Sequence, residues 1–276
     1  MKKNTFTKMC LCMVLVCLVV MTAEGAWATE ADFGTSGVQV RILGHSGKIQ
    51  FWNKTQGIGK MFQLEFNGLY ELPPASDLPP TSDTLTSNTF CAFANQDFTF
   101  SPLKELDYPG HTVGQTVPCK NINFTSPLML GDNQTTLTVK TYLFETSGTI
   151  TVDGNAVQVA EGYLKFTVEI SEWPFLNPAN ELILEMAVKT PTLSHTMIDH
   201  SINMGDGGFL VLASTAIIDA SSSPPGTTVP VATTLIQSGQ VGRLYFTFPS
   251  FTSDLAYDPI VYIVSSPTAI EDWHLY

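Results

Sequence analysis

The stretch that decides the fold class is Leu164-Lys165-Phe166-Thr167-Val168-Glu169-Ile170-Ser171. Apolar and polar residues alternate strictly along it. Such alternation is typical of a β-strand that is buried on one face and exposed on the other. We therefore expect the apolar side chains to lie in a core and the polar ones to face solvent. The predicted core face consists of Leu164, Phe166, Val168 and Ile170, and the predicted outer face of Lys165, Thr167 and Glu169.

Further strands are expected on both sides of this stretch, separated by clusters of Gly, Pro, Asn, Asp and Ser. The segments with similar patterns are 62–66, 137–144, 182–188, 209–217, 244–248 and 260–264. Residues 149–159 add a hairpin, because the Asp153-Gly154-Asn155 sequence between two alternating runs suits a tight turn. Helical spacing is nowhere sustained over three turns.

These strands predict an all-β fold. Each sheet has one apolar face that must be buried, so the expected architecture is a two-layer antiparallel β-sandwich, jelly-roll-like and built as a single domain. The domain should span residues 29–276. Prolines gather near 72–89 and 220–229, which we expect to be long loops.

Residues 1–28 have the pattern of a secretory signal peptide. Three lysines precede an apolar run at 9–21, and Ala26-Trp27-Ala28 offers a small-x-small cleavage site. The run is shorter than the roughly 20 residues that span a bilayer as a helix. We expect cleavage after Ala28 and a secreted, extracellular product without a membrane span.

The chain is acidic, with 13 basic and 25 acidic residues and a formal net charge of −12. Removing residues 1–28 leaves 10 basic and 24 acidic residues, so the charge becomes −14. This sign argues against nucleic acid as a partner, because both molecules would repel each other. The acidic residues form no dense run. We therefore expect any calcium binding to be weak and diffuse. We also expect no cofactor.

The cysteines and sequons agree with a secreted glycoprotein. Cys91 and Cys119 are the two cysteines left after removal of residues 1–28, and in an oxidising compartment two thiols most simply form one disulfide. Asn-x-Thr sequons occur at Asn53, Asn123 and Asn133. These asparagines should be glycosylated, and hence exposed at turns or strand edges.

No catalytic, cofactor-binding or metal-binding constellation stands out from the motifs. The densest set of possible ligands is His195, Asp199, His200 and Asp206. A polar loop that leads into a Gly207-Gly208 turn explains this set better than a metal site does. Gly131-Asp132-Asn133 lacks the spacing of a calcium-binding loop and is interpreted as a turn.

The tryptophans allow two interpretations. Trp52, Trp173 and Trp273 could form a platform on which sugars stack, but aromatic residues in a sandwich core are far commoner. Trp173-Pro174-Phe175 follows the strand 164–171 directly, so we expect it to be a strand end folded onto the core.

The order of several segments resembles a known family. These segments are 62–66 with 69–72, 95–100, 165–175 with its Trp173-Pro174-Phe175 phrase, and 246–251 with 257–259. Together they resemble the secreted acidic skeletal organic matrix proteins of corals, over roughly residues 49–264. The resemblance implies a protein of the calcified matrix without catalytic activity. The long aspartate-rich stretches of that family are absent here, so matrix or surface interaction is the broader expectation.

The leading hypothesis is a secreted, non-enzymatic glycoprotein that binds extracellular matrix components or a mineral surface. One alternative is a lectin-like β-sandwich module that binds glycans. The other is a secreted hydrolase whose catalytic residues the motifs do not reveal.

Overall fold

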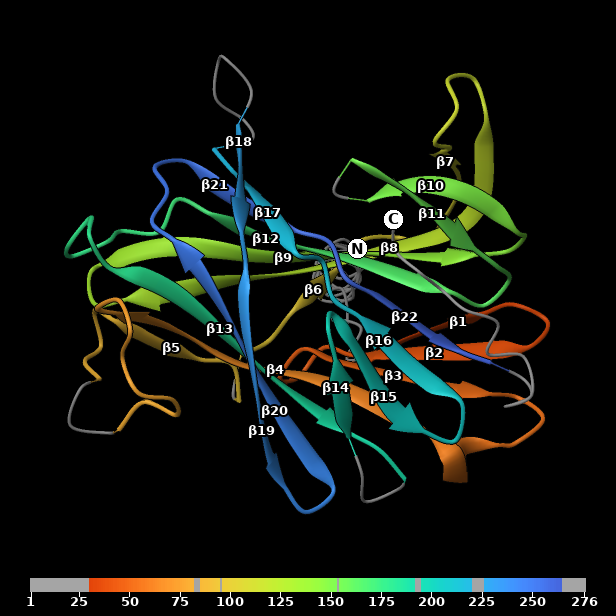
Figure 1. Ribbon diagram of the computed structural model, residues 1–276, viewed down its shortest axis with the longest axis horizontal. Coiled ribbons are helices and arrows are strands. Elements are labelled where there is room, and N and C mark those ends of the chain that lie inside the picture. Colours follow the sequence, from red (N-terminus) through yellow and green to blue (C-terminus); the bar gives the residue numbers. More distant parts are fainter. Residues whose placement is uncertain are drawn as a thin grey trace, which may run out of the picture.

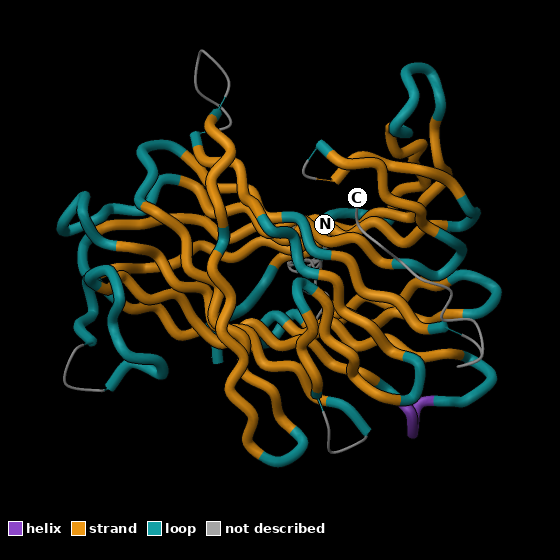
Figure 2. Tube along the Cα trace, in the orientation of Figure 1, coloured by secondary structure: helices purple, strands orange, loops and turns teal. Residues whose placement is uncertain are grey.

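The computed structural model describes residues 30–81, 85–94, 96–152, 154–191, 195–219 and 226–264. Over these ranges the chain consists of β-strands, loops and the short 3-10 helix Ile58–Lys60, which is the purple turn in Figure 2. The all-β prediction is confirmed. The predicted signal peptide and its cleavage site lie outside the described residues, as do Asp153, Trp273 and most of 220–229.

The first sheet is antiparallel and has eight strands among the described residues. Its order is β1-β2-β3-β4-β13-β20-β19, and β5 pairs with β4 (Figure 1). The strands are β1 Glu30–Gly34, β2 Val38–Leu43, β3 Lys48–Asn53, β4 Phe62–Leu72, β5 Phe90–Ala92, β13 Glu181–Lys189, β19 Ala232–Ser238 and β20 Val241–Pro249. No strand lies in the described parts of 73–89, where the sequence predicts a loop.

The second sheet has twelve strands over the same described ranges, and its pairs are again antiparallel. Its main order is β14-β15-β16-β22-β12-β21-β17-β18; β9 joins β12 to β8, and β8 also pairs with β6 and β7. The strands are β6 Thr99–Phe100, β7 Lys104–Pro109, β8 Thr116–Leu130, β9 Asn133–Phe144, β12 Leu164–Ser171, β14 Thr196–Ile198, β15 Ser201–Gly205, β16 Gly208–Val211, β17 Thr215–Ile218, β18 Thr227–Pro230, β21 Asp254–Tyr257 and β22 Ile260–Ile263.

A separate hairpin, β10 Gly148–Val152 and β11 Asn155–Val159, confirms the predicted turn near 153–155. Gly154 has φ 77°, a conformation that glycine adopts without a Cβ penalty. The predicted strand 209–217 is in fact two strands. β16 and β17 lie in different parts of the second sheet and are joined by residues 212–214.

The main core lies between the two sheets. The Phe66 ring of β4 contacts Phe124 of β8 and Phe166 of β12, with centroids 6.2 and 6.3 Å apart. At another point Phe248 of β20 contacts Tyr257 of β21 at 5.5 Å. The predicted core face of β12 is at most 1% exposed at Leu164, Phe166, Val168 and Ile170. The two layers share this core, so they form a single open sandwich.

The outer face of β12 differs from the prediction, because Lys165 and Thr167 are buried and Glu169 is half-buried. The reason is a third layer. β7 and the β10–β11 hairpin gather on the outer side of the second sheet, at the upper right of Figure 1. They enclose a satellite core that consists of Val117, Cys119, Phe144, Ile150, Val152, Val159 and Ile260.

The predicted disulfide is not formed, because Cys91 and Cys119 are both free, buried thiols. The Cys91 thiol lies beside the backbone of Met129 on β8, and Cys119 is on the same strand. At about 3.3 Å per residue, the ten residues from 119 to 129 span about 33 Å. A disulfide needs Cα atoms within about 7 Å of each other. Burial raises the pKa of each thiol to about 11.

Candidate functional site: a groove over the fork of the second sheet

The second sheet forks beside β12. One edge of β12 pairs with β22 through Leu164 and Lys165, and further along with β21 through residues 168–171. Between these strands, the carbonyl of Pro259 accepts a hydrogen bond from the Phe166 amide at 3.0 Å. Strands β16, β15 and β14 extend one arm from β22, and β17 and β18 extend the other from β21.

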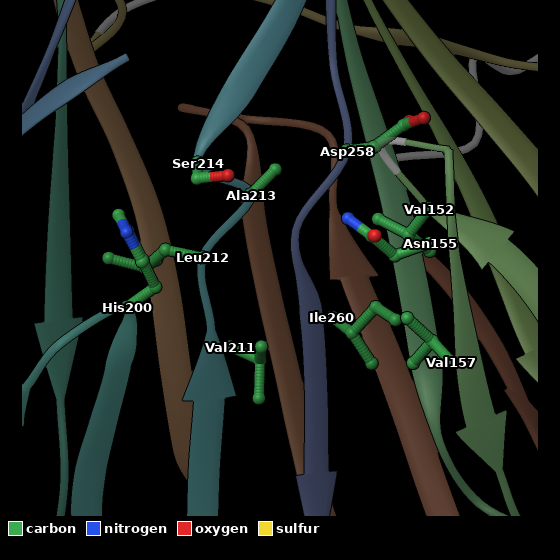
Figure 3. Close-up of a pocket in the computed structure, with 10 residues that line it drawn as sticks. All are labelled: Val152, Asn155, Val157, His200, Val211, Leu212, Ala213, Ser214, Asp258 and Ile260. Carbon is green, nitrogen blue, oxygen red and sulfur yellow. The ribbon is translucent and has the colours of Figure 1, made fainter. Parts of the chain in front are cut away.

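A cavity of about 180 Å³ lies over this fork. Figure 3 shows one wall formed by residues 211–214 and the other by the β10–β11 hairpin, with Ile260 between them. The Asn155 amide points from the hairpin toward the opposite wall. An adjoining hollow of about 130 Å³ shares Val157, Val211 and Ile260 with it and continues toward Tyr163 and Tyr262. We call the two together the fork groove.

The far end of the fork groove is a ladder of aromatic rings. Tyr163 and Tyr262 stack with centroids 4.3 Å apart, and Phe209 stacks on Tyr262 at 5.4 Å. Both faces of the Tyr262 ring are therefore covered, and burial raises its pKa to about 12. A sugar ring stacks on an open aromatic face, so Tyr262, which lies between two rings, is not a stacking platform.

The near end of the groove holds a buried charge cluster. The Lys165 ammonium, 1% exposed, donates to Asp258 Oδ1 at 2.6 Å and to Thr167 Oγ1 at 2.8 Å. It also lies 5.7 and 5.6 Å from the ring centroids of Tyr108 and Tyr142. The Asp258 side chain keeps 30% of its surface exposed. Asp258 is thus an anchored carboxylate at the edge of the groove.

The groove combines an apolar floor with a few polar groups, which is the usual composition of a ligand site. Its polar lining includes Asn155, Ser214, His200 and Asp258. A serine, a histidine and an aspartate in one site raise the question of a catalytic triad. Asp258 is bonded to Lys165 and Thr167, and Figure 3 shows its carboxylate and the His200 ring pointing away in opposite directions. The three side chains therefore do not form a triad.

The residues that the sequence singled out as the densest ligand set do not converge. His195 is buried against Gly242 of β20, where burial lowers the pKa of its imidazole. Asp199 and His200 form the turn between β14 and β15, and Asp206 in the next turn pairs with Lys60 at 3.0 Å. In the part of the chain that the structure describes, no three His, Cys, Asp or Glu side chains are placed to hold a metal.

Gly131-Asp132-Asn133 lies at the turn between β8 and β9, in agreement with the sequence. Trp173-Pro174-Phe175 also folds onto the core as expected, with Trp173 buried and Phe175 packed edge-on against Phe251 at 5.4 Å. Trp52 is buried as well. Neither described tryptophan offers an open platform for sugars.

The three sequon asparagines lie in different environments. Asn133 is exposed beside a turn, as predicted. Asn53 is buried, and its Oδ1 accepts hydrogen bonds from the Thr55 amide at 2.8 Å and hydroxyl at 2.6 Å, so its predicted exposure is wrong. Asn123 is half-buried within β8 and accepts from Asn121 at 3.0 Å. Glycosylation at all three positions stays a prediction, and Asn133 is the most accessible.

The sequence alone does not reveal the groove residues, for physical reasons. The alternation along β12 predicts that Lys165 faces solvent, because a strand's own pattern cannot show that Tyr108 of β7 and Tyr142 of β9 cover its outer face. The sequence indicates only that Asn155 belongs to a tight turn. The one local signal was Asp258-Pro259, a break between two apolar runs, because proline removes a ladder hydrogen bond and ends regular pairing.

Comparison with known proteins gives one family match. The model of a family described as acidic skeletal organic matrix protein matches residues 19–188, well over half of the chain. The match covers strands of both sheets, from β1 to β13. No curated protein is similar enough to match. Within the described residues, no helix has the length and apolar character to cross a membrane.

Proposed function

Because the chain belongs to the acidic skeletal organic matrix protein family, we propose that it is a secreted, non-enzymatic protein of a calcified extracellular matrix. In this role it binds other matrix components or the mineral surface. The family match carries the proposal. The first residues of the chain support it too, because they have the pattern of a secretory signal peptide.

The geometry supports a binding role through the outer faces of the two sheets. Charged side chains there are held in cross-strand ion pairs, such as Lys48 with Glu65 at 3.1 Å and Arg243 with Glu185 at 2.7 Å on the first sheet. Strands fix the spacing of such groups, since neighbours across a sheet lie about 4.8 Å apart. A rigid face with charges at fixed positions suits repeated contact with an extended partner.

The test is to locate the protein in the tissue. Antibodies against the full chain should label the organic material that remains after the skeleton is dissolved in EDTA. Mass spectrometry of that material should find peptides from residues 29–276 and none from 1–28. Finding the chain only inside cells would contradict the proposal.

The fork groove favours a second candidate function, the binding of a glycan. Its Asn155 amide, Ser214 hydroxyl and anchored Asp258 carboxylate surround an apolar floor, and together they offer the donors and acceptors that sugar hydroxyls need. A glycan array with and without calcium tests this. Asn155→Ala should remove any binding, whereas Gln240→Ala, in the exposed turn between β19 and β20, should not. An array without hits would leave matrix binding as the sole proposal.

A further inference from the structure

A second hollow, of about 270 Å³, lies on the outer face of the first sheet. It sits where β4, β13, β20 and β19 run side by side (Figure 1). The residues that line it are Glu65, Asn67, Ala187, Lys189, Ser238, Val241 and Arg243. Ala187 lies in register between Glu65 and Arg243. Its short side chain leaves the hollow that its longer neighbours surround.

The charges around this hollow are arranged in two levels. The carboxylates lie deep, with 15% of the Glu65 side chain and 4% of the Glu185 side chain exposed. The cations lie above them, with 44% of Lys189 and 50% of Arg243 exposed. The surface that solvent meets is therefore cationic, in a chain whose formal net charge is −12.

The deep carboxylates hold the cations in place. Arg243 donates to Glu185 Oε1 at 2.7 Å, and Lys189 bonds to Glu65. Glu185 also accepts hydrogen bonds from Asn67 at 2.9 Å and from Tyr70, so its position is fixed from several sides. The cationic groups are thus preorganised at the rim of the hollow, and a ligand need not order them.

We infer that the hollow binds a planar oxyanion, a carboxylate or carbonate group. A guanidinium carries five N–H donors in a fixed fork and an ammonium carries three, so each exposed cation has donors beyond those that its partner carboxylate needs. The fork of Arg243 matches the geometry of two oxygens in one plane. Ser238 and Asn67 add a hydroxyl and an amide to the lining. This site is separate from the fork groove. Its anionic ligand goes beyond the proposed function, which specifies no ligand of this kind.

The experiment is isothermal titration of the full mature chain with sodium acetate and with sodium bicarbonate at pH 8, against sodium chloride at the same ionic strength. Three variants report on the site. Ala187→Val fills the hollow without changing charge. Lys189→Gln removes one cation, and Lys48 still pairs with Glu65, so the fold should persist. Lys140→Gln is the matched control, because it removes the same charge from the Lys140–Glu169 pair on the second sheet.

We expect saturable binding of both anions to the unmodified chain and to Lys140→Gln. Binding should be about tenfold weaker or more in Lys189→Gln, since a hydrogen bond to a charged group accounts for about that factor. Binding should also be weaker in Ala187→Val, because the added methyl groups occupy the space that the anion needs. A short polyaspartate peptide identifies the source of the anion. If the peptide binds more tightly than acetate, the natural ligand is a carboxylate of an acidic polypeptide. If it binds no more tightly, the natural ligand is the free anion.

Two results would overturn the inference. One is the absence of saturable heat with both anions, and the other is an equal loss of affinity in Lys140→Gln. Thermal unfolding of each variant shows whether it is folded. If Ala187→Val does not fold, the affinity of Lys189→Gln for the two anions decides whether the inference holds.

Discussion

Lys165 shows how strongly the environment of one residue departs from its local sequence pattern. Its ammonium lies among Tyr108, Tyr142 and Thr167, and it neutralises Asp258 at the edge of the fork groove. Burying a charge is tolerable only when it is paired and hydrogen-bonded, and Lys165 meets both conditions. The pair therefore fixes the groove's carboxylate.

Replacing this lysine tests that account. Lys165→Met should lower the free energy of unfolding by about 1–3 kcal/mol, less than the loss for a fully buried pair, because water can still reach Asp258. Urea unfolding measures it. Lys140→Met, in a half-exposed pair, should cost about 1 kcal/mol or less. Equal losses from both variants would show that burial of Lys165 has no energetic consequence.

His195 should make stability depend on pH. Burial lowers the pKa of its imidazole below the unfolded value, so in mildly acidic solution the unfolded chain takes up the proton first. Its contribution is fully present above the unfolded pKa of about 6.5 and is lost as pH falls toward the folded pKa. His195→Leu should flatten the decline in unfolding free energy between pH 7 and 5. His45→Gln, which removes an exposed histidine, is the control. The same slope in both variants would contradict the assignment.

Among the larger elements, the end of β4 fixes the loop that precedes β13. Glu71 is buried and accepts hydrogen bonds from the amides of Leu176 at 2.9 Å and Asn177 at 3.1 Å. It also accepts from the side-chain amide of Asn180 at 2.8 Å and from the Trp173 indole at 3.4 Å. Two segments that carry the family resemblance, 69–72 and 165–175, meet at this carboxylate.

Glu71→Gln would place an amide NH₂ where these donors expect an oxygen. We expect a loss of about 1–3 kcal/mol in unfolding free energy and faster hydrogen exchange in residues 173–180. Glu172→Gln, on the exposed surface of the same loop, should change neither quantity. Unchanged exchange in Glu71→Gln would mean that the loop is held by its packing alone.

The β10–β11 hairpin offers a clean test of turn chemistry. Gly154 has φ 77° and open space around an added Cβ, so Gly154→Ala should cost about 1–2 kcal/mol from backbone strain alone. Gly59→Ala has the same open space but no positive φ, and it should be neutral or slightly stabilising. A neutral Gly154→Ala would show that the turn adopts another conformation.

The positions of many strands can be predicted from the sequence, but the segments that pack against each strand cannot. The period-two pattern located β12, β13 and β20 because one face of each strand meets the main core. The same pattern does not reveal the burial of Lys165, because the Tyr108 and Tyr142 rings that cover it belong to other strands. The run 209–217 is interrupted only by the polar pair Ser214-Thr215, which does not by itself show that β16 and β17 lie in different parts of the sheet. The predicted Cys91–Cys119 disulfide is wrong because the number of cysteines says nothing about the distance between them in the fold.

At the scale of the molecule, the 25 acidic residues form no dense run in the sequence, and most of the described lysines and arginines are held in ion pairs. We expect calcium to bind weakly, through dispersed carboxylates, because exposed charges are screened by salt. Isothermal titration with calcium chloride should show binding that fades between low and physiological ionic strength. A saturable site of micromolar affinity that persists in salt would contradict this. Asp132, exposed beside the β8–β9 turn, would then be the first residue to replace.

The most direct test of the central claim is co-sedimentation of the purified mature chain with demineralised skeletal matrix in physiological salt. Membership of the family and the rigid outer faces of the sandwich predict that the protein pellets with the matrix and saturates it. A monomeric acidic protein of similar size and charge should stay in the supernatant. If the chain also remains in the supernatant, to the same extent as that control, it is not a binding component of the matrix.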